Sequence, residues 1–123
     1  MNYTFARNQY KKSANAALSA LIDPHEMIGL TMKELSRCLS ALQNDGIGGD
    51  RRKNYLSKAF TAVYILQTSL DFDKGQDIAS NLFKLYEYIR IQLQKTMKND
   101  ASATLLVCNE ILNEIIDAWD NIK

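Results

Sequence analysis

The stretch that decides the fold class is LLVCNEILNEIIDAWDNI, residues 105–122 of the chain. Its apolar residues follow alternating steps of three and four positions: Leu105, Cys108, Leu112, Ile115, Trp119 and Ile122. Side chains with this spacing share one face of an α-helix. The pattern therefore predicts an amphipathic helix whose apolar face packs against a core.

An earlier helix has a clear start signal. Asp23 can accept hydrogen bonds from open backbone amides, Pro24 suits the first helical position, and Glu26 completes a capping-box pattern. We predict that this helix begins at Pro24 and that the glycines within residues 44–50 end it.

Two further helices are expected between these two. The second helix begins near residue 50 and ends at a turn formed by residues 71–75. The third covers about residues 76–97, and Asn99-Asp100 separates it from the last helix. The expected core residues are Ile28, Met32, Leu35, Leu39 and Leu42 in the first helix, Leu56, Ala59, Phe60, Val63, Leu66 and Leu70 in the second, and Ile78, Leu82, Leu85, Tyr86, Ile89 and Leu93 in the third.

The expected fold is an all-α, antiparallel, up-down four-helix bundle. Helices of about 20 residues are about 30 Å long, and short loops place consecutive helices side by side. We expect residues 1–123 to form a single domain, because a division would leave pieces too small to bury a core. Residues 23–123 form the bundle. Residues 1–22 are expected to lie on it as a strap, cap or short helix, because their aromatic side chains are costly to leave in water.

The composition excludes several classes of function. Lys and Arg number 15 and Asp and Glu 14, so the net charge of +1 leaves no surplus of cations for nucleic acid. No apolar run is long enough to span a membrane, and residues 1–10 lack the apolar core of a signal peptide. We therefore expect a cytoplasmic protein that neither inserts into a membrane nor binds nucleic acid.

The chain also lacks the residue patterns of enzymes and metal sites. Its one histidine, His25, lies at a helix start, and its two cysteines, Cys38 and Cys108, are far apart. Zinc and di-iron sites need more ligands of these types, and phosphate-binding and nucleophile motifs do not occur. We expect no enzymatic activity, no cofactor and no metal. Both thiols should be buried, and His25 should be a surface or cap-supporting residue.

Some apolar residues are predicted to lie outside the core. On a helical projection Ile65 points away from the core face of its helix, and Tyr64 lies at the margin of that face. Tyr88, Ile91 and Leu106 fall outside the core faces of the later helices. Single exposed apolar residues are common, but a surplus on several helices indicates a surface that an apolar partner segment covers.

Several short motifs occur in a characteristic order along the chain. They are Asp23-Pro24-His25, LYEYI at residues 85–89, the Asn99-Asp100 break and Ala118-Trp119. In these motifs and their spacing the chain resembles FliS, a family of flagellar secretion chaperones for flagellin. One departure is Met32-Lys33-Glu34, where the family tends to have an aromatic residue followed by Asp-Gly.

The resemblance implies a helical bundle that binds the disordered C-terminal segment of flagellin in the bacterial cytosol. It implies that the chaperone prevents premature polymerisation and assists delivery to the flagellar type III export gate. In the family an N-terminal segment with tyrosines lies over the bundle and rearranges when flagellin binds, and Tyr10 matches that position. The expected partner-binding residues are Tyr10, Tyr64, Ile65, Tyr88 and Ile91.

Three other functions stay open. A bundle of this shape could act as an adaptor or chaperone for a different secreted substrate. A phosphorelay protein would use His25, and a homodimer would bury the surplus apolar residues against a second copy.

Overall fold

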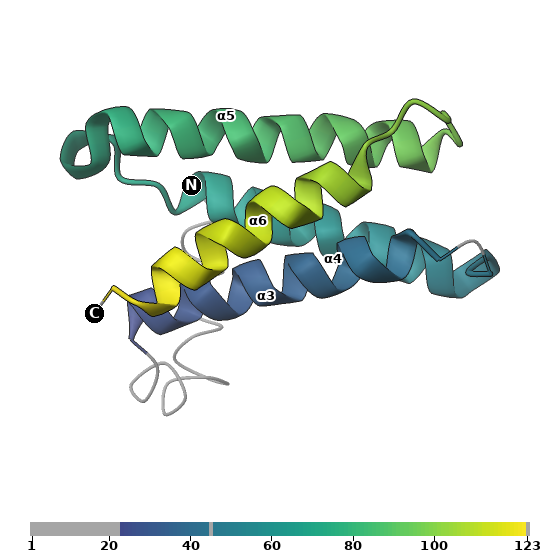
Figure 1. Cartoon of the computed structure of the whole chain (residues 1–123), viewed down its shortest axis with the longest axis horizontal. Helices are drawn as coiled ribbons and strands as arrows, with labels where there is room; N and C mark the ends of the chain where they lie inside the picture. Colours follow the sequence, from purple (N-terminus) through teal and green to yellow (C-terminus); the bar gives the residue numbers. More distant parts are fainter. Residues whose placement is uncertain (1–22, 45, 123) are drawn as a thin grey trace, which may run out of the picture.

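Four α-helices form the structure, a computed structural model that describes residues 23–44 and 46–122. Within these residues there is no strand, and the helices pack against one another as a bundle (Figure 1). This confirms the expected all-α fold. The expected strap over residues 1–22 lies outside the described residues. The helices are α3 (Pro24–Leu42), α4 (Gly49–Thr68), α5 (Phe72–Met97) and α6 (Leu105–Asp120).

Helix α3 begins where the sequence predicts. The Asp23 carboxylate accepts a hydrogen bond from the Glu26 backbone N–H at 2.7 Å, and Pro24 occupies the first helical position. Such a cap satisfies one of the amides that a helix start leaves open. The start of α3 is therefore fixed by local chemistry.

Helix α5 begins earlier than predicted. The expected turn at residues 71–75 is wrong, because Asp71 caps a helix that starts at Phe72 and accepts from the Lys74 N–H at 3.0 Å. A kink follows at Gln76, whose φ of 46° and ψ of −115° are not helical. The regular part of α5 thus begins close to the predicted start, but a preceding turn extends the helix to 26 residues.

The core joins all four helices. Leu35 and Leu39 of α3, Ile89 of α5 and Leu112 of α6 are fully buried. Two core predictions are wrong, because Ile78 is 70% exposed and Ile122 is 57% exposed. Ile78 lies in the early turns of α5, and Ile122 follows the end of α6 at Asp120. The partly buried residues that pack against the core are Ile28, Tyr55, Phe60, Leu70, Leu82, Leu85, Ile115 and Trp119.

A polar network sets the register between α3 and α6. The Ser36 hydroxyl donates to Asn109 Oδ1 at 2.7 Å, and Asn109 Nδ2 donates to the Ser40 hydroxyl at 2.8 Å. Asn109 is buried, so sliding one helix past the other would leave its amide without partners at a cost in free energy. The network therefore favours one alignment of α6 on α3.

Helices α5 and α6 are close at one end and diverge toward the other. Near the loop that joins them, Gln92 Oε1 accepts from the Thr104 backbone N–H at 3.1 Å, and the Tyr88 and Thr104 hydroxyls are 2.6 Å apart. From there α6 runs obliquely toward the start of α3 (Figure 1). The first half of α5 consequently extends beyond the support of α6.

Candidate functional site

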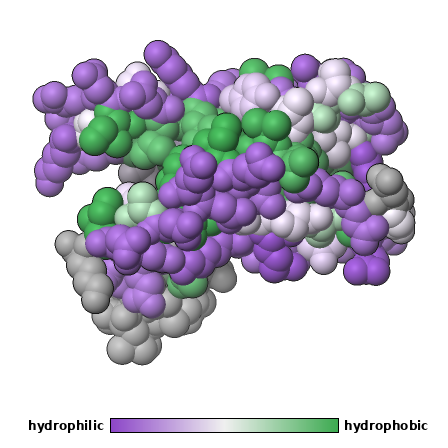
Figure 2. Space-filling model, in the orientation of Figure 1, coloured by the Kyte–Doolittle hydropathy of each residue, from purple (hydrophilic) through white to green (hydrophobic). Residues whose placement is uncertain are grey.

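An apolar groove lies between the first half of α5 and the second half of α6, and we call it the α5–α6 groove. Its volume is about 350 Å³. Figure 2 shows hydrophobic residues gathered between these two helices. The apolar lining consists of Ile28 and Met32 from α3, Leu66 from α4, Leu70 after it, Ile78, Ala79, Leu82 and Tyr86 from α5, and Ile115 and Trp119 from α6. A surface of this kind suits the apolar side chains of a peptide.

The unequal lengths of the two helices create the groove. At 1.5 Å per residue, the regular part of α5 after the kink, residues 77–97, is about 32 Å long, and α6 is about 24 Å long. Helix α6 therefore cannot cover both ends of α5, and it covers the C-terminal end. The early turns of α5 are left with an apolar face that α6 does not fill.

The end of α6 is held on α3 by His25 and Trp119. The two rings stack with centroids 4.3 Å apart and an interplanar angle of 6°. The indole Nε1 donates to the His25 carbonyl at 2.8 Å, and the imidazole Nε2 donates to the Trp119 carbonyl at 2.9 Å. Gly29 leaves room for the indole, since a Cβ there would approach Trp119 Cδ1 to 3.2 Å. Trp119 therefore forms a fixed wall of the groove.

The floor of the groove is closely packed and its rim is open. Tyr86 is 2% exposed, its hydroxyl lies 3.8 Å from Met32 Sδ, and burial raises the pKa of Tyr86 to about 12. Ile78 on the rim is mostly exposed, whereas Leu82 and Ile115 are partly buried. The groove thus combines closely packed walls with apolar area that is still in contact with water.

The predicted partner-binding residues of the bundle are exposed but are not gathered at one place. Tyr64, Ile65, Tyr88 and Ile91 all present apolar surface. Ile65 lines a separate hollow of about 360 Å³ between α3 and α4, whereas Tyr88 bonds to Thr104 at the close end of α5 and α6. None of the four lines the α5–α6 groove. The fifth, Tyr10, lies outside the described residues.

Sequence reasoning missed the groove because it treated Ile78 and Leu82 as core residues. The helical spacing correctly placed Ile78 and Leu82 on the inward face of α5. It could not show that α6 leaves this face uncovered. One signal was available. Asp71 is a favoured N-cap residue, and a helix that began after it would have been longer than the last helix.

The cysteines and the potential metal ligands among the described residues do not form a second site. Cys38 and Cys108 are buried and unbridged, and burial raises the pKa of Cys108 to about 11. Within residues 23–44 and 46–122, no group of three His, Cys, Asp or Glu side chains could hold a metal ion. None of the four helices combines the length and hydropathy needed to cross a membrane.

Comparison with known families identifies the kind of protein. A profile of the family described as flagellar protein FliS matches residues 6–123, nearly the whole chain. The chain belongs to the FliS family. This FliS family chain is 36% identical to the flagellar secretion chaperone FliS of Vibrio cholerae over 121 residues, which cover 92% of this chain and 85% of the relative.

Two further relatives agree with this assignment. The flagellar secretion chaperone FliS of Salmonella typhimurium is 35% identical over 113 residues, covering 89% of this chain and 82% of the relative. The chaperone FliSB of Pseudomonas aeruginosa is 26% identical over 122 residues, covering 96% of this chain and 95% of the relative. No solved structure is significantly similar to the chain. Family membership gives this protein a role as a flagellar export chaperone rather than an enzyme.

Proposed function

We propose that this chaperone binds the disordered C-terminal segment of flagellin in the bacterial cytosol. Binding there keeps flagellin subunits from polymerising prematurely, and the loaded chaperone assists their delivery to the flagellar type III export apparatus. The observation that carries the proposal is the α5–α6 groove, an apolar surface that the described helices do not fill.

The demands of binding a disordered segment fit an extended apolar surface. A segment that folds on binding gives up roughly 2–5 kcal/mol of its interaction energy to become ordered, and it commonly buries about 1,000–3,000 Å². The α5–α6 groove alone is too small to bury an area of this size. Tyr64, Ile65, Tyr88 and Ile91 offer additional apolar surface at other parts of the bundle. We therefore propose that flagellin follows a path around the bundle that includes the groove and these four residues.

We further propose that the N-terminal segment, with Tyr10, covers part of this surface in the free chaperone. Apolar area left in water favours association, so a cover within the same chain would limit self-association. The alternative is a homodimer that covers the surface with a second copy. Light scattering over a range of concentrations separates these arrangements, since only the homodimer gives a mass that rises with concentration.

Calorimetry with the C-terminal peptide of the flagellin from the same bacterium tests the proposal. We expect the unmodified chaperone to bind, and Ile65→Asp and Ile91→Asp each to weaken binding, because each places a charge in an apolar contact. Asn54→Asp adds the same charge at an exposed position of α4 and should bind normally. Circular dichroism checks that every variant is folded.

Two results would count against the proposal. Absence of binding by the unmodified chaperone would contradict flagellin as the substrate and favour a different secreted protein. Unchanged affinity in both folded isoleucine variants would remove Ile65 and Ile91 from the binding surface.

A further inference from the structure

A strained kink interrupts helix α5 at the open end of the α5–α6 groove. The backbone of Gln76 has a φ of 46° and a ψ of −115°, a conformation that glycine adopts readily and other residues avoid. Residues 72–75 therefore form a turn that is bent relative to the rest of α5 (Figure 1). Such a conformation persists only where the surrounding contacts hold it.

The residue before the kink has the opposite preference. A Cβ atom on Gly75 would lie only 2.8 Å from the Cβ of Ala79, because the kink brings the turn back against the helix. In a straight helix, the Cβ atoms of residues four apart are about 5–6 Å from each other, so glycine would not be needed there. Gly75 therefore favours the kinked form of α5, whereas Gln76 favours the straight form. The sequence at this point is compatible with two conformations.

Few contacts hold the kinked turn in place. The ring of Phe72 lies against that of Phe83, with centroids 6.0 Å apart and an angle of 59° between the rings, yet Phe72 is half exposed. The Asp71 carboxylate accepts from the Lys74 N–H at 3.0 Å, and the Asp71 carbonyl accepts from the Gly75 N–H at 2.7 Å. Both hydrogen bonds lie within residues 71–75, so they can move together with the turn.

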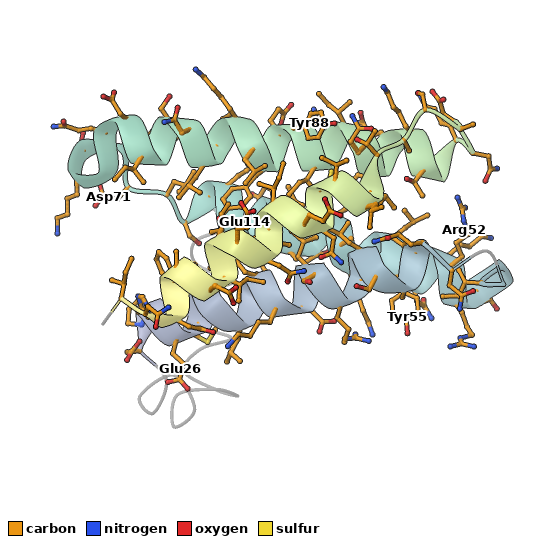
Figure 3. The ribbon with its side chains drawn as sticks, in the orientation of Figure 1. Glu26, Arg52, Tyr55, Asp71, Tyr88 and Glu114 are labelled. Carbon is orange, nitrogen blue, oxygen red and sulfur yellow. The ribbon has the colours of Figure 1, made fainter. Side chains whose placement is uncertain are left out.

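The kinked turn is also part of the groove. Asp71, Lys74 and Gly75 line the groove together with its apolar residues. Figure 3 shows Asp71 where the chain enters α5, at the end of the helix that lies away from the loop to α6. Straightening the kink would move these residues out along the axis of α5 and make the regular helix about 6 Å longer. The kinked turn therefore limits the length of the groove.

We propose that residues 71–76 form a hinged flap, which limits the groove in the free chaperone and opens when cargo enters. Gln76 is kinked when the flap is closed and helical when the flap is open. Cargo selects the open form because it contacts the apolar surface that the flap uncovers. This inference rests on the proposed binding of flagellin and adds a conformational control to it.

Three substitutions of Gln76 shift the flap in known directions. Gln76→Gly removes the strain of the kink and favours the closed flap. Gln76→Val increases the strain and favours the open flap, because a β-branched residue tolerates positive φ poorly. Gln76→Ala removes the side chain but keeps a residue that suits a helix and avoids positive φ, so it controls for contacts of the glutamine side chain.

Urea denaturation tests the kink without any cargo. Gln76→Gly should raise the urea midpoint, because glycine suits the kinked backbone. Lys84→Gly makes the matched change at an exposed, regular position of α5 that does not line the groove, and it should lower the midpoint. If both glycine variants lower the midpoint, residue 76 is helical in the free protein and the proposal is overturned.

Energy transfer reports the position of the flap. The donor is Trp119, the only tryptophan of the chain and a wall of the groove, and the acceptor is a dye on Lys74→Cys in the flap. The native cysteines are buried and should not take the dye. In the free chaperone we expect less transfer with Gln76→Val than with Gln76→Gly. Equal transfer in these two variants would mean that residue 76 is not a hinge.

Calorimetry with the C-terminal peptide of flagellin tests whether the flap controls cargo binding. The apparent affinity scales with the fraction of chaperone that has an open flap. Gln76→Gly should therefore raise the Kd about threefold to tenfold, and Gln76→Val should lower it. Gln76→Ala and Lys84→Gly should leave the Kd within about a factor of two.

These experiments separate the flap from the proposed function. If the flagellin peptide binds every variant with the same Kd, the flap does not control cargo entry, and the proposal fails while the flagellin-binding role stands. If the peptide does not bind even the unmodified chaperone, flagellin is not the cargo. The urea midpoints and the energy transfer of the free variants then decide whether the flap exists.

Discussion

Replacing Ile78 by alanine should weaken cargo binding while leaving the bundle stable. Full burial of an isoleucine side chain contributes about 1.5–3 kcal/mol. Ile78 is 70% exposed in the free chaperone, so roughly 1–2 kcal/mol remains to be gained when a peptide covers it. Ile78→Ala should therefore raise the Kd for the flagellin peptide by a factor of about 5–30.

The same exposure limits the effect on folding. Less than a third of the Ile78 side chain is buried, and alanine has the higher helix propensity, so the loss in the free energy of unfolding should stay below about 1 kcal/mol. Calorimetry gives the Kd, and urea denaturation gives the stability of the same sample.

A matched control lies at the other end of the same helix. Met97 is also exposed but does not line the groove, so Met97→Ala should leave the Kd within about a factor of two. Equal affinity for Ile78→Ala and Met97→Ala would refute the assignment of the groove as a cargo site. Unfolding of Ile78→Ala would refute the claim that its side chain contributes little to the core.

Three further predictions concern the bundle itself. Asn109→Ala should lower the free energy of unfolding by about 1–3 kcal/mol in urea titrations, because Ser36 and Ser40 lose their partner; a loss under about 0.5 kcal/mol would argue against the register network. The Arg90 guanidinium, assisted by the Gln67 amide, lowers the pKa of Glu87 from 4.5 to about 2. A carboxyl group whose pKa is lowered on folding stabilises the fold at any pH above the ordinary pKa of that group. The stability advantage over Glu87→Gln should therefore be complete at neutral pH and vanish as the pH falls from about 4.5 to about 2. A difference that does not vary with pH would exclude this ion pair as its source. Cys108 in the native protein should react with a thiol reagent at pH 8 far more slowly than in urea, because it is buried with its pKa raised to about 11; rapid labelling of the native protein would contradict that burial.

The sequence by itself determined those features of the bundle that depend only on residues close together in the chain. The cap at Asp23 and the proline after it specify the start of α3, since both act within one helical turn. Steps of three and four place Leu105, Cys108 and Leu112 on the buried face of α6, because the period of the helix fixes the direction of each side chain. The exposure of Ile65 followed from the same geometry, whereas Tyr64, predicted at the margin of the core face, is also exposed.

The tertiary structure alone decided where the groove lies. Helical periodicity correctly assigned Ile78 to the inward side of α5, but it gives only the direction of a side chain and not what occupies the space in front of it. That space is open because α6 is shorter than α5 and because the contact of Trp119 with His25 holds its end on α3. Both causes join residues far apart in the chain, so no local pattern of spacing contains them.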